Sequence, residues 1–561
     1  MTNSDIADII KLFANLTELH GGNEFKIKSY SAASFKIDKL LTPLEGKSIE
    51  ELEKIDGVGK SLAGKIFELN HSETFTELQQ LIEATPAGVI DMMRIKGIGP
   101  KKIAMIWKEM AIESIGELLY ACRENRLAQA KGFGLKTQEN VIQQIEFIFA
   151  SAHKFHYAKV EKTAQDLVKH LAKYDETDEV SLTGAIRRKC DTIDALEVCI
   201  AINGDENNLA QYIAESLNIS EIEVNTSSIC FSINGTLPVI IYFCEQDDYT
   251  ETLFETTAAA KHLELLQTVS AGAHFKNASS ETEIYTRINL PYIEPEMREG
   301  VAEIKWAQNP QRPALIELTD LKGILHNHST YSDGQNTLEE MAIYCKELGY
   351  QYLGICDHSK AAFYAKGMKE ETILLQHAEV DKLNQKLGSD GSFKVFKGIE
   401  SDILNDGSLD YSNDVLASFD FIVASIHSNL KMSEEKAMNR LLRAIENPYT
   451  TILGHPTGRL LLMREGYPVD HQKMIDACAA NNVIIEINAH PYRLDLDWRW
   501  VDYALNKGVK LSVNPDAHER EGYHDMYYGV CAARKGGLHK EMCLNALSLP
   551  EITTYFQAKK P

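Results

Sequence analysis

Histidine and acidic side chains close a series of short apolar runs in the C-terminal part of the sequence. Seven runs have this form: GILHNH (323–328), YLGICDH (352–358), VFKGIE (395–400), DFIVASIH (420–427), TILGHP (451–456), VIIEINAH (483–490) and KLSVNPDAH (510–518). Buried parallel strands whose C-terminal ends carry polar side chains are the layout of an α/β-barrel active site. Seven runs, where a regular barrel has eight, predict an irregular barrel.

The polar residues at these run ends have the types and the spacing of metal ligands. His326 and His328 are two residues apart, which on a strand turns both to the same side, and Asp516 and His518 repeat this spacing. The candidate ligands are nine: His326, His328, Asp333, His358, Glu400, His427, His455, Asp516 and His518. Imidazole combined with carboxylate suits Zn, Mn or Fe, and nine ligands suit two or three divalent ions, with Glu400 able to bridge them.

A cluster of this kind favours one class of reaction. Ions held together generate a hydroxide at neutral pH and neutralise charge on the attacking and leaving oxygens, so phosphoester hydrolysis is expected. Asp357 and His490 are candidates for orienting ligands, with a position on the outer rim as the alternative. Arg459, Arg464 and Arg493 also follow run ends, where they either hold a phosphate or lie on a solvated surface.

Length and composition restrict the class of protein. The chain has 561 residues, 44% of them hydrophobic and 25% charged, which predicts three or four ordinary folded domains. No apolar run reaches the roughly 18 residues of a membrane span. The N-terminal MTNSDIADIIKLF lacks the features of a signal peptide, so a cytoplasmic protein is expected. Ten cysteines without a CxxC pair indicate reduced core residues.

The sequence pattern divides the chain into segments. Residues 1–150 read as short helices joined by glycine-containing turns, and residues 151–306 mix helices with β-rich runs. The polar, proline-containing stretch 307–320 has the composition of a linker. Short apolar strands alternate with helices from 321 to 561, which predicts an α/β domain.

A repeated glycine motif in the first segment predicts contact with DNA. IDGVGKSLAGKI (55–66) and IKGIGPKKIAMI (95–106) match closely, and KGFGLKTQENVI (131–142) is a looser copy. Each Gly-x-Gly turn exposes backbone N–H groups at a helix N-terminus, where they can bind a phosphate. The residues concerned are Gly57, Gly59, Lys60, Gly97, Gly99, Lys101, Lys102, Gly132 and Gly134. This helix-hairpin-helix pattern reads the DNA backbone independently of sequence; the alternative is a turn that only packs two helices.

Taken together, these motifs resemble two known families. H-N-H-x(4)-D-G, DHS, GIESDI, SIH, GHPTGRLL and NPDAH resemble the PHP (polymerase and histidinol phosphatase) domain, and all nine candidate ligands match the metal-binding positions of that family. NEFKIKSYSAASFKI (23–37), TGAIRRKCDTIDALEV (183–198) and LPYIEPEMREG (290–300) resemble the bacterial family X DNA polymerases that carry a C-terminal PHP domain. The resemblance implies a helical DNA-binding region, a nucleotidyltransferase-like palm and thumb of α+β type, and a (β/α)7 PHP barrel.

The polymerase signature departs from the family at its chemical positions. Polymerisation needs two carboxylates two residues apart on one strand and a third on a neighbouring strand. The family's Gly-Ser corresponds here to Gly184-Ala185, and its Asp-x-Asp falls on Ala195-Leu196-Glu197. No acidic residue occurs between Glu223 and Glu245. Templated synthesis is therefore expected to be lost, leaving a scaffold that contacts DNA through Arg187 and Arg188.

The leading hypothesis is a metal-dependent DNA phosphoesterase, a 3′→5′ exonuclease with 3′-end or abasic-site processing in DNA repair. A phosphatase for small monoesters, of histidinol-phosphatase type, is the first alternative, but it leaves the glycine repeats without a role. A DNA-binding scaffold without catalysis and a residual gap-filling polymerase are the others. The net charge of −23 disfavours only a protein that coats nucleic acid non-specifically.

Overall fold

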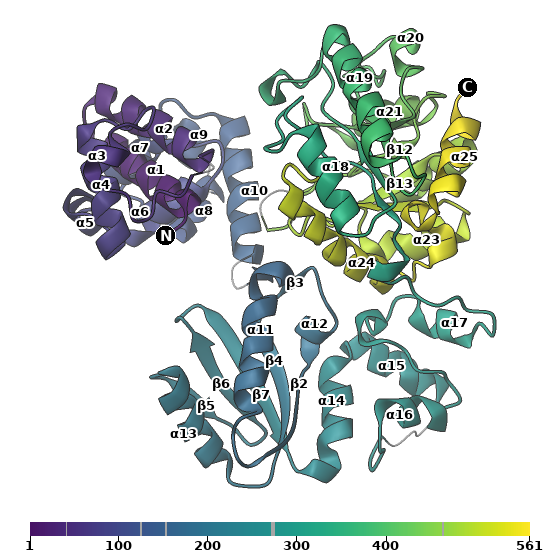
Figure 1. Cartoon of the computed structure of the whole chain (residues 1–561). Helices are drawn as coiled ribbons and strands as arrows, with labels where there is room; N and C mark the ends of the chain where they lie inside the picture. Colours follow the sequence, from purple (N-terminus) through teal and green to yellow (C-terminus); the bar gives the residue numbers. More distant parts are fainter. Residues whose placement is uncertain (41, 124–125, 152–153, 271–274, 463–464) are drawn as a thin grey trace. The chain divides into compact units, whose positions relative to one another are not determined.

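The computed structural model describes residues 1–561 except 41, 124–125, 152–153, 271–274 and 463–464. Two compact units make up the chain, Met1–Ala152 and His153–Pro561, and each is described by itself (Figure 1). None of the described helices combines the length and apolar content that crossing a membrane requires. All ten cysteines are free thiols, as the sequence predicts.

The first unit is helical. Its helices are α1 (Asn3–Leu19), α2 (Glu24–Asp38), α3 (Ile49–Leu52), α4 (Lys60–Ser72), α5 (Thr76–Glu83), α6 (Ala87–Asp91), α7 (Pro100–Lys108), α8 (Ile115–Arg123), α9 (Arg126–Gln129) and α10 (Leu135–Ser151). Apolar residues at helical spacing, among them Ile6, Ile10 and Phe13, form one continuous core. Helices this short are stable through such packing and not through intrinsic propensity.

The second unit begins with a five-stranded sheet of order β2-β4-β7-β6-β5. Its first elements are β1 (Phe155–His156), α11 (Tyr157–Leu171), β2 (Thr177–Leu182), α12 (Gly184–Arg187), β3 (Thr192–Ile193), β4 (Leu196–Ile202) and α13 (Glu206–Leu217). The sheet continues with β5 (Ile222–Val224), β6 (Ser228–Ile233) and β7 (Leu237–Cys244), and then come α14 (Tyr249–Thr257), α15 (Ala260–Val269), α16 (Glu281–Arg287) and α17 (Glu303–Gln308). This mixed α/β layout agrees with the α+β expectation.

The C-terminal part forms the expected barrel. Seven parallel strands follow the order β14-β13-β12-β11-β10-β9-β8: β8 (Gly323–Ile324), β9 (Tyr352–Ile355), β10 (Lys394–Asp402), β11 (Phe421–Ser425), β12 (Ile452–Leu453), β13 (Ile484–Asn488) and β14 (Leu511–Asn514). A parallel bridge between Asn327 and Ala517 joins the first and last strand regions, so the sheet is nearly closed. The seven predicted strands are thereby confirmed.

Helices surround these strands, because a parallel sheet must be covered on its outer face (Figure 1). They are α18 (Leu338–Glu347), α19 (Glu370–Leu387), α20 (Asn413–Leu416), α21 (Glu434–Ile445), α22 (His471–Asn481), α23 (Val501–Asn506), α24 (Met526–Lys535) and α25 (Leu549–Lys559). Fully buried Leu453, Ile485 and Leu511 contribute to the largest core.

The segment read as a linker packs onto the barrel. Ile316 is fully buried, and its backbone N–H donates to the carbonyl of Leu538. Close by, the buried ammonium of Lys535 donates to the carbonyl of Arg188 at 2.9 Å and to the carboxylate of Glu299 at 2.6 Å. Charged side chains thus join the mixed α/β part to the barrel within one compact unit.

Candidate metal centre

The C-terminal ends of the barrel strands bring all nine predicted ligands into one cluster. Four overlapping groups have ligand atoms within 4.8 Å of one another: His328, Asp333, His358 and His518; His326, His455 and Asp516; His326, His328 and Glu400; and His358, Glu400 and His427. Each predicted ligand belongs to at least one group. Parallel strands end at the same edge of a sheet, so residues far apart in sequence converge there.

Glu400 lies at the centre of this cluster. Its Oε1 is 3.2 Å from Nε2 of His326 and 3.0 Å from Nε2 of both His427 and His455. Its Oε2 is 2.8 Å from Nδ1 of His358 and 3.7 Å from Nε2 of His328. A carboxylate with both oxygens among five imidazoles has the position that a bridging ligand needs.

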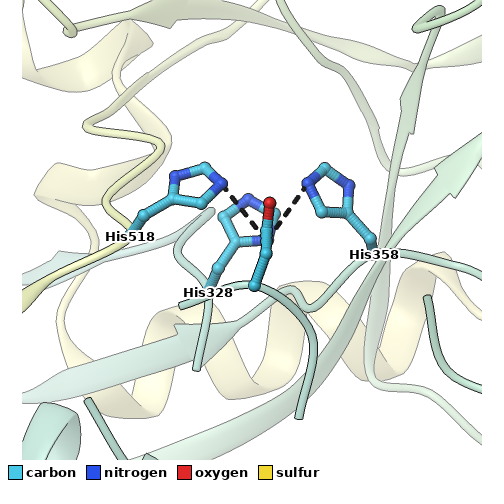
Figure 2. A group of neighbouring side chains, drawn as sticks. His328, His358 and His518 are labelled. Atoms are coloured by element: carbon cyan, nitrogen blue, oxygen red, sulfur yellow. Dashed lines mark ion pairs between the residues drawn. The ribbon is translucent and has the colours of Figure 1, made fainter. Parts of the chain in front are cut away.

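A second focus lies around Asp333. The imidazole rings of His328, His358 and His518 point toward one another in Figure 2. Ring centroids of His328 and His518 are 4.2 Å apart and nearly parallel, and Oδ1 of Asp333 lies 3.4 Å from His518 and 3.6 Å from His358. Three imidazoles and one carboxylate match a Zn-type or Mn-type ligand set.

Three of the ligands have positive φ angles, which the strand interpretation did not anticipate: His326, His455 and Asp516. Strand β8 ends at Ile324, two residues before His326, so the premise that His326 and His328 share a strand face is wrong. His326 and Asp516 have φ angles of +61° and +52°. Left-handed φ costs a non-glycine residue about 1–2 kcal/mol, and such residues cluster at functional sites. The turns still bring Oδ1 of Asp516 to 3.0 Å from Nε2 of His328.

Burial and close packing set the charge states in the cluster. Burial lowers the pKa of His328 to about 3, and the neighbouring rings of His518 and His358 act in the same direction. Burial by itself would raise the pKa of Glu400, but His427, His326 and His358 hold it well below its usual range. The carboxylates in turn raise the pKa of His427 to about 10 and of His518 to about 9. Because metal binds to the neutral imidazole and the ionised carboxylate, a metal ion would displace protons from these two rings.

The polar atoms of the cluster fit a divalent cation. Nδ1 of His328 and Nδ1 of His455 are buried and have no hydrogen-bond partner among the described residues. A buried polar atom left in this state costs about 1–3 kcal/mol. Imidazole nitrogens of this kind, gathered around a carboxylate, are the donor set of transition-metal sites.

Glu486 and Asp402 orient ligands and were missed in the sequence. Oε2 of Glu486 lies 2.6 Å from Nδ1 of His326, and Oε1 accepts the backbone N–H of His455 at 3.0 Å. Oδ1 of Asp402 lies 3.0 Å from Nδ1 of His427. Such carboxylate–histidine contacts fix the tautomer and the ring orientation of a ligand. The sequence did carry a signal for each. Glu486 is an acidic residue within the apolar run VIIEIN, and Asp402 follows Glu400 by two residues.

The two residues predicted to orient ligands lie beside the cluster. The carboxylate of Asp357 accepts hydrogen bonds from the hydroxyls of Ser329 and Ser332 at 2.7 and 2.6 Å, so it shapes the turn before Asp333. His490 makes its hydrogen bonds with Tyr492 and Asn488. These hydrogen bonds join neither residue to the side chain of a predicted ligand, and their role in orienting ligands stays a prediction.

The predicted arginines have different surroundings. Arg459 donates to Asp497 at 2.5 Å and to two backbone carbonyls, and it also reaches Asp191 of the palm at 3.4 Å. These contacts occupy its guanidinium, so a phosphate-binding role for Arg459 has no support. Arg493 lies 3.7 Å from Asp516 and is the one beside the cluster. Arg464 lies outside the described residues.

Comparison with known proteins identifies the family. A protein of Bacillus subtilis (strain 168) named DNA polymerase/3'-5' exonuclease PolX is 32% identical over 579 aligned residues, covering 99% of this chain and 100% of that protein. The chain belongs to the PolX family. Residues 325–490 match the PHP domain, residues 1–75 match a helix-hairpin-helix domain, and residues 89–146 match a SAM-like helix-hairpin-helix tandem.

The barrel also has relatives outside the PolX family. Probable phosphatases of Thermoanaerobacter sp. (strain X514) and of Thermoanaerobacter pseudethanolicus are each 25% identical over 253 residues. The alignments cover 43% of this chain and 97% of each of those proteins.

In this PolX-family chain the three glycine repeats form the same turn. The first glycine of each, Gly57, Gly97 or Gly132, has a φ between +84° and +99°, a conformation that favours glycine. Gly59 and Gly99 are the N-caps of α4 and α7 and make no side-chain capping bond, and Gly134 precedes α10. The N–H groups that could bind a phosphate lie at these helix starts.

The predicted lysines near these turns differ in their contacts. Lys101 lies 3.3 Å from Glu24 and 3.9 Å from Glu18, so DNA would compete with two surface acids for it. The ammonium of Lys102 lies over the Phe133 ring at 5.4 Å, and Lys60 is exposed. The DNA-contact role of these residues stays a prediction.

Gly99→Val is expected to weaken DNA binding about tenfold without lowering the melting temperature. A Cβ at Gly99 meets no protein atom within 4 Å, so the added side chain starts in open space at the helix start, where a phosphate would approach. Fluorescence anisotropy with labelled duplex DNA at several salt concentrations measures the affinity. Gly97→Ala is the contrasting variant, since its Cβ would lie 2.6 Å from Nδ2 of Asn140 and its stability should fall. Unchanged affinity in Gly99→Val would contradict a phosphate contact there.

The palm positions that correspond to the polymerase carboxylates are largely apolar. Glu197 on β4 pairs with Ile240 on β7 in a parallel register, and its side chain contacts the hydroxyl of Tyr242 and the backbone N–H of Ala185. Residue 195 is alanine. Glu197 is the one carboxylate at the positions that the sequence resemblance assigns to the polymerase ligands, and the loss of templated synthesis stays a prediction.

Nearby charged residues of the palm have structural partners. Arg187 makes a bidentate contact with Glu281 at 2.9 and 2.7 Å, and Arg188 bonds Glu299 at 3.0 Å. These ion pairs occupy both guanidinium groups, so DNA would have to compete with Glu281 and Glu299 for them; DNA contact by the two arginines stays a prediction. Asp191 is buried against Arg459 and Asp194 lies 3.3 Å from Lys154, so neither contacts Glu197.

Proposed function

We propose that this chain is a metal-dependent DNA phosphoesterase that acts as a 3′→5′ exonuclease. The single observation that carries the proposal is the convergence of nine imidazole and carboxylate ligands at the C-terminal edge of the barrel. Helix-hairpin-helix matches at the N-terminus and the 3'-5' exonuclease in the name of the Bacillus relative support DNA as the substrate.

The proposal divides the work among the segments. Residues 1–150 bind the DNA backbone, the palm and thumb in 151–306 form a positioning scaffold joined to the barrel by 307–320, and residues 321–561 carry the chemistry. Two or three divalent ions, Mn, Zn or Fe, would activate water and neutralise charge on the phosphate when bound. DNA ends or gaps are the expected substrates, the expected pathway is DNA repair, and the protein is expected to be cytoplasmic.

Side chains of this chain have distinct roles in the proposal. Glu400 and the histidines around it hold the ions, and Glu486 and Asp402 keep the rings of His326 and His427 oriented. Arg493, next to Asp516, is placed to donate to a substrate phosphate. Arg459 instead stabilises the loop after His455 through its ion pairs with Asp497 and Asp191.

The test uses a labelled single-stranded or 3′-recessed oligonucleotide, the purified chain and Mn²⁺, with His326→Ala as the variant. Stepwise loss of 3′ nucleotides is expected, and the variant should lose it because His326 contacts Glu400. A matched control is His539→Ala, which removes an imidazole that pairs only with Glu541 in the described structure. Intact DNA in the presence of bound metal would reject the exonuclease.

The second candidate is a phosphatase for small monoesters, favoured by the two Thermoanaerobacter relatives that cover the barrel. The affinity for DNA held through several phosphates falls steeply as the salt concentration rises. Hydrolysis of a small monoester should depend only weakly on salt. Hydrolysis of monoesters without degradation of DNA would favour this candidate.

A further inference from the structure

A loop at the edge of the barrel presents an unusually exposed aromatic ring. Residues 359–369 follow the ligand His358 and lead into α19, so the loop lies at the strand end that carries the metal ligands. Phe363 within it is 85% exposed. A single exposed aromatic ring is common on protein surfaces, but its position beside a candidate active site makes Phe363 a candidate for contact with the substrate.

The exposure of Phe363 does not come from a loosely held loop. The backbone N–H of Met368 donates to the carbonyl of His358 at 2.8 Å, and Ser359 and Met368 form a parallel bridge. The hydroxyl of Tyr411 accepts the N–H of Lys360 at 3.1 Å and donates to the carbonyl of Met368. These bonds tie both ends of the loop to each other and to a neighbouring segment, so the ring is held out by a defined backbone.

The same loop is positively charged in an acidic protein. Residues 359–369 contain Lys360, Lys366 and Lys369 and no acidic residue, while the whole chain has a net charge of −23. Lys360 is paired with Glu370 at 2.8 Å. Lys366 and Lys369 are exposed, and neither forms an ion pair within the described part of the chain. Phosphates are the natural partners of such side chains.

We propose that Phe363 stacks on a base near the 3′ end of single-stranded DNA while Lys366 and Lys369 contact its backbone. The proposal rests on the proposed exonuclease function. Aromatic rings flanked by basic residues are the usual platform for single strands. Five residues separate Phe363 from His358, which limits their Cα separation to about 18 Å. At about 3.4 Å per stacked nucleotide, the platform lies within about five nucleotides of the cluster.

Single-stranded DNA explains these features better than an apolar protein partner. The remaining loop residues are serine, alanine, glycine, lysine, tyrosine and methionine, and the buried Met368 adds nothing to the surface. One exposed phenyl ring and two exposed ammonium groups that form no ion pair within the described residues match a base and its phosphates. A monoester of histidinol-phosphate type has neither a second phosphate nor a nucleobase to use this surface.

Phe363→Ala is expected to raise the KM for a single-stranded oligonucleotide about tenfold, the loss of one stacked base, with little change in kcat. Hydrolysis of bis(p-nitrophenyl) phosphate, which has no base, should stay unchanged. Phe363→Trp should keep the wild-type KM. The matched control is Leu348→Ala, because Leu348 is exposed but precedes β9 and so lies toward the opposite end of the barrel. Equal KM values for Phe363→Ala and the wild type would overturn the proposal.

A crosslinking experiment separates this proposal from the exonuclease proposal. An oligonucleotide with 5-iodouracil near its 3′ end is bound to the His326→Ala chain and irradiated, and crosslinked tryptic peptides are identified by mass spectrometry. A crosslink within residues 361–366 is expected and would support the platform even if the wild type degraded no DNA. Degradation by the wild type, with crosslinks only elsewhere, would leave the exonuclease standing and reject the platform.

Discussion

Replacing Glu400 by glutamine will lower the rate of 3′ nucleotide removal by at least about 10³-fold. The carboxylate has both oxygens among five imidazoles, and glutamine keeps its size while removing its charge. An ion held at such a site contributes several kcal/mol to the transition state, and each 1.36 kcal/mol is a factor of ten in rate. Metal content, measured by mass spectrometry of the purified chain, should fall in parallel.

Two further substitutions give rates with which the loss in Glu400→Gln can be compared. Glu486→Gln keeps every ligand but weakens the contact that orients His326. Its rate of 3′ nucleotide removal should therefore fall about 10- to 100-fold. Glu435→Gln alters an exposed residue of α21 and should leave both the rate and the metal content unchanged. If Glu400→Gln retained wild-type degradation and metal content, the nine-ligand cluster would not be the active site.

Primer extension by this chain will be absent, even when its nuclease activity is removed. Two-metal nucleotidyl transfer needs carboxylates from neighbouring strands, and here Glu197 faces Ile240 and Tyr242 across the β4–β7 pair with Ala195 in the other ligand position. The assay follows a labelled primer on a gapped template with all four nucleotides and Mg²⁺ or Mn²⁺, in the Glu400→Gln background to protect the product.

The Bacillus subtilis relative, whose name includes DNA polymerase, is the positive control for that assay. DNA binding by the Glu400→Gln chain should be measured in the same buffer, so that missing extension is not mistaken for missing contact. Template-directed addition of nucleotides would contradict the prediction and would mean that Asp191 or Asp194 moves to join Glu197.

The helical segment and the barrel were predictable from the sequence for a clear physical reason. Gly57 and Gly97 need left-handed φ angles, a demand that local sequence shows directly. The barrel strands were recognisable as apolar runs ending in polar residues. Their precise lengths were not, because β8 ends at Ile324 and the chain then turns at His326. At this point the ligands from different strands converge on one centre, and the chain leaves the strand conformation so that His326 can reach it.

The sequence by itself determined which nine residues could meet, because the ends of consecutive parallel strands meet at one edge whatever the loops between them do. Only the tertiary structure decided which side chains orient them and which are already engaged. Glu486 is 160 residues from His326, and Arg459 is 268 residues from Asp191. Pairings over such separations depend on how strands and loops pack, and no local spacing records them. The exposure of Phe363 is likewise a property of the folded loop.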